Sequence, residues 1–187
     1  MVTATTSPTN GQTTPTMKPR ARHSTFDSIS AALDAIRYGD PSLAFEASKY
    51  LINTRVRTDS LTAIALDQKR DKTNRVAAIS TLAFLGRKNS VPALIAIVAD
   101  KKEPMKIRGE AAEAVGYARD KRPIPLFRKI IMSGEKPGLK AECIFALARI
   151  GGSESLAVLR EFERTKPAGE VAAQLKEALA DIKNGIM

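Results

Sequence analysis

Residues 107–126 read IRGEAAEAVGYARDKRPIPL, and this stretch decides the fold. Apolar side chains recur at helical spacing from Ile107 to Ala118, a polar turn follows at 119–123, and a second apolar run begins at Ile124. Recurrence every three or four residues is typical of a helix with one buried face. The stretch therefore predicts two short helices joined by a tight turn.

The same pattern returns along the chain with a period of 32 or 33 residues. A shift of one period aligns Leu82, Val115, Leu147 and Leu179, and the neighbouring apolar positions follow in the same steps. A period of this length is typical of stacked helical hairpins whose neighbours bury a common core. We therefore expect hairpins at 75–98, 107–132 and 139–164, weaker copies at 41–68 and 171–182, and a leading helix at 26–38.

Charged residues recur with this period as well. A basic residue occupies the first helix of each complete unit, as Arg75, Arg108 and Lys140. An acidic residue precedes each of these helices, at Asp71, Glu103 and Glu135. A carboxylate in that place complements the positive end of a helix dipole, so we expect a structural role for the acidic set.

The motif IRGEAAEAVG at 107–116, followed by Ile124-Pro125-Leu126, resembles a HEAT-like repeat of the short bacterial type, which is also known from relatives of bilin lyases. Residues 74–94 and 139–159 match the same pattern, and the resemblance spans roughly residues 41–182. It implies an all-α fold, a right-handed α-solenoid of helical hairpins whose second helices line the concave face. Ala157 departs from the pattern, because the other two units carry proline there.

The first 24 residues differ in composition from the rest. They are rich in Thr and Pro, contain no Asp or Glu, and end in a run that includes Lys18, Arg20 and Arg22. Such a segment buries too little apolar surface to offset its chain entropy. We expect a disordered basic tail at 1–24 and a HEAT-like domain at 25–187. A transit peptide and a true start at Met17 are the alternatives.

Composition excludes several classes of protein. One His and one Cys among 187 residues cannot form a multi-ligand Cys/His zinc site or a disulfide framework. No apolar run has the length of a membrane span. We expect a cytoplasmic protein that uses no cofactor and has no membrane partner.

The positive charge is concentrated in the middle of the chain, where residues 69–138 carry sixteen basic and seven acidic side chains. A basic surface suits an acidic partner. We expect an acidic protein segment to bind a second-helix strip, made of Ile95, Arg128, Lys129, Met132, Arg160 and Arg164. A secondary basic patch, which we call the turn patch, comprises Arg87, Lys88, Arg119, Lys121 and Arg122.

No catalytic constellation stands out in the sequence. Cys143 falls in a buried column, His23 lies in the tail, and the carboxylates of Glu110 and Glu113 are expected on a solvent-facing surface. We expect a protein-binding scaffold or regulatory adaptor that is not an enzyme and has no small-molecule substrate. Two alternatives stay open. Basic ridges suit nucleic acid, although stacking aromatics are scarce, and the resemblance alone implies assistance in bilin attachment.

Overall fold

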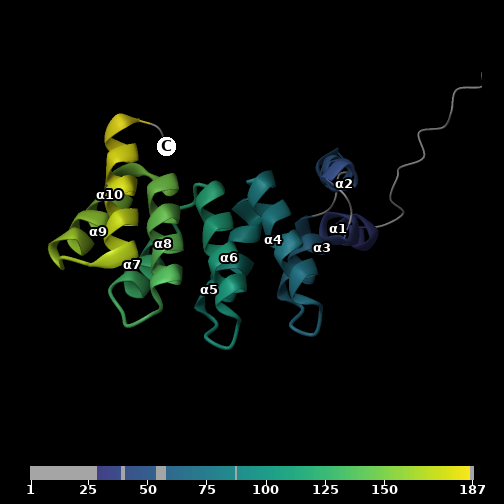
Figure 1. Ribbon diagram of the computed structural model, residues 1–187, viewed down its shortest axis with the longest axis horizontal. Helices are drawn as coiled ribbons and strands as arrows, with labels where there is room; N and C mark the ends of the chain where they lie inside the picture. Colours follow the sequence, from purple (N-terminus) through teal and green to yellow (C-terminus); the bar gives the residue numbers. More distant parts are fainter. Residues whose placement is uncertain (1–28, 39–40, 54–57, 87, 186–187) are drawn as a thin grey trace, which may run out of the picture.

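The structure is a computed structural model and describes residues 29–38, 41–53, 58–86 and 88–185. These ranges contain no strand; they hold a short 3-10 turn at Lys88–Ser90 and ten α-helices (Figure 1). The helices are α1 (Ile29–Tyr38), α2 (Pro41–Asn53), α3 (Thr58–Leu66), α4 (Lys72–Leu85), α5 (Val91–Ala99), α6 (Met105–Tyr117), α7 (Ile124–Ile131), α8 (Pro137–Ile150), α9 (Gly152–Arg164) and α10 (Gly169–Asn184).

Three hairpins, α4–α5, α6–α7 and α8–α9, stand where the period predicts them. Their apolar columns meet in one continuous core, in which Leu82, Val115 and Leu147 are fully buried. Each hairpin has too little apolar surface to be stable alone, and stacking supplies the missing partner. The prediction of an all-α solenoid of helical hairpins is confirmed, while the predicted tail at 1–24 lies outside the described residues.

Local signals explain where helices begin and end. Asp71 caps α4, because its carboxylate accepts a hydrogen bond of 2.8 Å from the backbone N–H of Thr73. Gly86 ends the same helix with a φ of +56°, a conformation that costs little only for glycine. The turn between α8 and α9 is very short. Gly151 and Gly152 both adopt positive φ, so the chain reverses within two residues.

The first helices of the hairpins pack directly against one another. In Figure 1, α4, α6, α8 and α10 stand side by side as a row of rods. Helices α6 and α8 approach closely, because a Cβ on Gly116 would lie 2.9 Å from the Cα of Ala146. Glycine and alanine at this seam let the two backbones approach closely, so small side chains set the helix spacing.

The second helices are spaced differently. Helices α5, α7 and α9 have few residues close to one another and pack mainly on the first helices. The first helices therefore form the more closely packed layer, and the small Gly116 and Ala146 side chains at the α6–α8 contact help to explain this difference.

Both ends of the array are closed by helices outside the three hairpins. At the N-terminal side α1 packs on α2 and α4, and α3 packs on α4; at the other end α10 packs on α8 and α9. Solenoids need such atypical terminal elements to cover the core. None of the described helices is long and apolar enough to cross a membrane.

Candidate partner-binding surfaces

A buried ion pair joins the first two hairpins. The Arg75 guanidinium donates to both carboxylate oxygens of Glu103, at 2.7 and 2.8 Å, and its Nε donates to the carbonyl of Ala65 at 2.8 Å. Both side chains are almost inaccessible, at 3% and 4% of their full exposure. Because these three bonds lie inside the junction and both side chains are buried, Arg75 holds the stack together and does not face a ligand.

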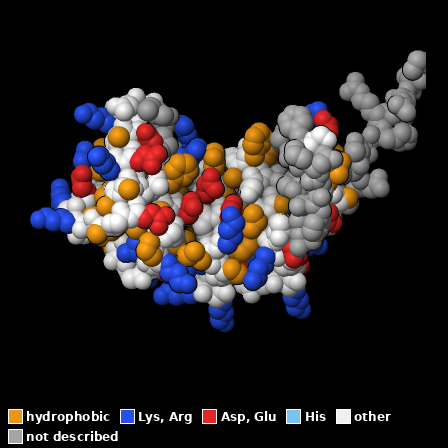
Figure 2. All heavy atoms as spheres, in the orientation of Figure 1, with side chains coloured by type: hydrophobic (Ala, Val, Ile, Leu, Met, Phe, Trp, Pro, Cys, Tyr) orange, Lys and Arg blue, Asp and Glu red, His pale blue; other side chains and the backbone are white. Residues whose placement is uncertain are grey.

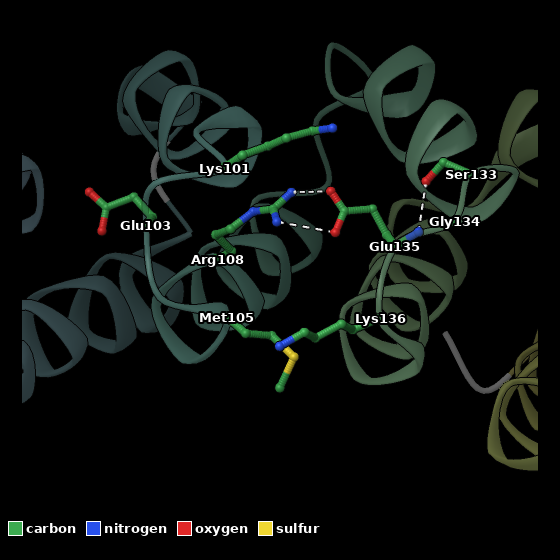
Figure 3. Close-up of a pocket in the computed structure, with 8 residues that line it drawn as sticks. All are labelled: Lys101, Glu103, Met105, Arg108, Ser133, Gly134, Glu135 and Lys136. Carbon is green, nitrogen blue, oxygen red and sulfur yellow. Dashed lines mark hydrogen bonds and ion pairs between the residues drawn. The ribbon is translucent and has the colours of Figure 1, made fainter.

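The next junction repeats this arrangement around a pocket of about 520 Å³ (Figure 3). Arg108 donates to Glu135 at 3.0 and 3.3 Å, and its Nε donates to the carbonyl of Val98. The pKa of Glu135 is lowered, first by this hydrogen bond from Arg108. The sequence assigned Glu103 and Glu135 to helix dipoles. Only Asp71 of the acidic set caps a helix, and the carboxylates of Glu103 and Glu135 accept hydrogen bonds from arginines instead.

The third junction lacks its ion pair. Lys140 takes the place of the arginine, and Pro167 stands where Glu103 and Glu135 stand in the other junctions. The Lys140 ammonium lies 6.0 Å from the centre of the Phe162 ring, beside a pocket of about 310 Å³. The repeated electrostatic link is therefore absent from this one described junction.

The second-helix strip is partly neutralised by its own neighbours. Arg128 pairs with Glu161 across the α7–α9 gap, and Arg160 pairs with Glu163 at 2.8 Å. Within the described chain, Lys129 and Arg164 make no ion pair. Ile95 and Met132 are only partly exposed and pack on the core.

The turn patch, like the second-helix strip, is partly paired with neighbouring groups of the same chain. Arg122 forms two hydrogen bonds with the carboxylate of Asp120 and a third with the carbonyl of Lys88. This pairing lowers the pKa of Asp120. Arg119 and Lys121 are exposed, while Arg87 lies outside the described residues.

The first helices carry three of the exposed large apolar side chains. On the first helices, Phe84 is 71% exposed, Met105 46% and Tyr117 42%. The guanidinium of Arg149 lies between two aromatic rings, 4.0 Å from the centre of Tyr117 and 4.5 Å from that of Phe145. Its buried Nε has no hydrogen-bond partner, which fits a group held by ring faces.

Two adjoining hollows run along the same row of helices. One, of about 140 Å³, lies between α6 and α8, and the other, of about 370 Å³, lies between α8 and α10. They share Glu113, Gly138 and Glu142, so they form a single groove. Its carboxylates, which we call the groove acids, are Glu110, Glu113, Glu142, Glu170 and Glu177.

The groove acids are short of counter-charges. Lys106 pairs with Glu110 at 2.6 Å, but no ion pair in the described chain involves the other four. The pKa of Glu142 is raised, first by burial and then by the charges of Glu113 and Glu110. Sequence reasoning placed Glu110 and Glu113 on an open surface. The signal that it missed is the period, which brings Glu142 and Glu177 beside them from the next helices.

The thiol of Cys143 is made unreactive by its burial in the core. Cys143 is fully buried, and burial is the main reason that its thiol pKa is raised far above the ordinary value. His23 lies outside the described residues. Within the described ranges, no group of three or more His, Cys, Asp or Glu side chains is arranged to hold a metal ion.

Comparison with known proteins agrees with this architecture. Residues 99–180 match the family model described as HEAT repeats. This part of the chain carries HEAT repeats, and the described chain is built as a scaffold of helical repeats. It is similar in structure to a chain in the complex of CpcE and CpcF of phycocyanin lyase from Nostoc sp. PCC7120, with a TM-score of 0.58 and 19% identity. The match covers 95% of this chain and 71% of that one. No curated protein matches the sequence.

This similarity corrects one prediction. We expected a protein that is not an enzyme, because no catalytic motif was recognisable. The structural relative is part of a lyase, so the same fold occurs in an enzyme whose repeats resemble these. The expectation is wrong on this finding, and the lack of a familiar catalytic motif is no argument against enzymatic activity.

Proposed function

We propose that this chain binds a partner protein across the row of first helices α4, α6, α8 and α10. The observation that carries the proposal is the exposure of Phe84 and Tyr117 at equivalent positions of two adjacent first helices, with Met105 exposed at the other end of α6. Aromatic residues and methionine are enriched where proteins meet, and an exposed apolar patch marks an interaction surface. The two-subunit complex of the structural relative supports a role in binding protein.

An acidic partner on the second-helix strip stays a separate proposal. It is less favoured, because Arg128 and Arg160 already pair with carboxylates that an acidic partner would have to displace. Exchanging one carboxylate for another gains little free energy at an exposed site. Nucleic-acid binding by the turn patch meets the same objection at Arg122.

The test is affinity capture with the immobilised full chain in two matched double variants. Phe84→Ser/Tyr117→Ser removes the exposed rings of the first helices, and Arg128→Glu/Arg160→Glu reverses charge on the opposite helices. The proposal expects a defined protein to be retained by the wild type and the second variant and lost by the first. Far-UV circular dichroism confirms that each variant is folded. Capture that survives the first variant and fails in the second would favour the strip.

A second candidate function is assistance in attaching a bilin to a phycobiliprotein. It is favoured by the similarity to a phycocyanin lyase complex, at an identity that supports the fold alone. Incubation of the full chain with a bilin and an apo-phycocyanin acceptor tests it, with covalently bound chromophore read by fluorescence after denaturation. Attachment no faster than in the protein-free control would remove this candidate.

A further inference from the structure

We infer that the groove across α6, α8 and α10 accepts a basic segment of the partner protein. Lysine or arginine side chains of that segment meet the groove acids, and one arginine stacks on the exposed ring of Phe84. The inference rests on the proposed function and adds the chemistry of the partner. It is opposite in sign to the acidic partner that the composition predicted.

The faces of α6, α8 and α10 that line the groove have no partner within the described chain. Three helices that lie side by side present one continuous groove, in which Glu113 and Glu142 line both halves. Neighbouring helices are about 8–10 Å apart, so three of them offer about 20 Å of contact, enough for several turns of a bound helix or a short extended segment. Nothing in the described chain covers this face.

The groove is also strongly acidic. Five carboxylates line the groove and a single ammonium, that of Lys106, faces them. The chain as a whole carries a formal charge of +10, so the acidic groove differs in sign from the rest of the molecule. Figure 2 shows the contrast, with acidic side chains along the middle of the visible face and basic ones along the lower rim. Complementary potentials steer and orient binding partners.

The same face already holds a guanidinium. Arg149 lies between Tyr117 and Phe145 at ring-face distances. Phe84 occupies the position equivalent to Tyr117 in the preceding repeat, and its ring is exposed. An arginine of the partner stacked on Phe84 would repeat the contact that Arg149 makes.

Other occupants fit less well. A nucleic-acid backbone would bring phosphates against five carboxylates, and like charges this close repel. A metal ion is disfavoured as well, because the described carboxylates do not converge to form a metal-ligating group. A cationic peptide satisfies the charge and the aromatic surface together.

The test uses two synthetic helical peptides of about 18 residues, about 27 Å long when helical. They share the same leucine positions and carry either lysine or glutamate elsewhere, with a fluorescent label for anisotropy. We expect the full chain to bind the lysine peptide at least about tenfold more tightly than the glutamate peptide at physiological ionic strength. Glu113→Gln/Glu142→Gln should weaken that binding about tenfold, the value for the loss of two screened charge pairs.

Matched controls separate the groove from general electrostatics. Glu154→Gln/Glu163→Gln changes the net charge equally on α9 and should leave the affinity for the lysine peptide within about twofold of the wild type. Equal affinity for the two peptides, no binding of the lysine peptide, or equal effects of the two double variants would each overturn the inference. The proposed function fails separately, if capture of the partner is insensitive to Phe84→Ser/Tyr117→Ser. If capture depends on the rings but not on Glu113 and Glu142, only the present inference fails.

Discussion

Arg75 and Glu103 form an ion pair of two hydrogen bonds, at 2.7 and 2.8 Å, which is buried between the first two hairpins. Arg108 and Glu135 repeat it one unit later in a more accessible setting. The two pairs lock successive hairpins in the same relative position. Because each arginine also holds a backbone carbonyl of the preceding unit, the pairs link three segments of chain at once.

Removing one partner of the buried pair should be costly. Glu103→Gln leaves the guanidinium of Arg75 buried without its counter-charge, and we expect a loss of about 3–5 kcal/mol in the free energy of unfolding. Urea denaturation followed by circular dichroism measures it. The control is Glu163→Gln, which breaks the exposed pair with Arg160 and should cost less than about 1 kcal/mol. Similar losses in both variants would contradict the role of burial.

The third junction can be given the link that it lacks. Lys140→Arg/Pro167→Glu restores both residue types at the positions that pair in the other junctions, and we expect a gain of about 1 kcal/mol in unfolding free energy. Pro167→Ala is the control for removal of the proline alone. A double variant no more stable than this control would show that the third junction differs in geometry.

Helix spacing at the α6–α8 seam depends on one missing methyl group. Gly116→Ala would place a Cβ 2.9 Å from the Cα of Ala146, so the helices must separate, and we expect a loss of about 1–3 kcal/mol. Gly134→Ala serves as the matched control, because its Cβ would meet nothing within 4 Å. The difference between their denaturation midpoints measures the steric cost. Equal midpoints would refute it.

The groove should make stability depend on pH through Glu142. Its pKa is raised in the folded protein by burial and by Glu113 and Glu110, so folding disfavours the ionised form. This penalty is absent below the unfolded pKa and grows as pH rises through the folded pKa. Glu142→Gln removes it, so the variant should gain more stability over the wild type at pH 8 than at pH 5. Urea denaturation of both proteins at the two pH values measures this difference. A gain that is the same at both would contradict the shift.

The thiol of Cys143 should be unreactive in the folded protein. Burial excludes reagent and raises the thiol pKa, so thiolate does not form near neutral pH. We expect reaction with a disulfide reagent to proceed only at the rate of unfolding, and to become fast in concentrated urea. Rapid labelling of the native protein would show that the helices around Cys143 open readily.

Much of the fold follows from the period alone. The column from Leu82 to Leu147 predicts the hairpins, because each unit must bury the same face against its neighbour. The spacing of the first helices does not follow, since it depends on how closely backbones approach. That approach is decided by Gly116 and Ala146, whose small size is visible in the sequence but whose contact is not.

The groove was harder to predict than the helices. On a single helix, Glu110 and Glu113 are expected to be an ordinary solvated pair. They become part of an acidic groove only because α8 and α10 bring further carboxylates beside them. The prediction of the second-helix strip missed the ion pairs of its arginines for the same reason. Glu161 follows Arg128 by one whole period, so their contact depends on the stacking of units.

The unequal spacing of the two layers also has a mechanical consequence. Where α6 and α8 approach closely at Gly116 and Ala146, the row of first helices resists compression, while α5, α7 and α9, which have few residues close to one another, can move with less steric hindrance. The molecule should therefore bend mainly by movement of its second helices. The width of the groove, which lies on the first helices, should then stay nearly constant during bending.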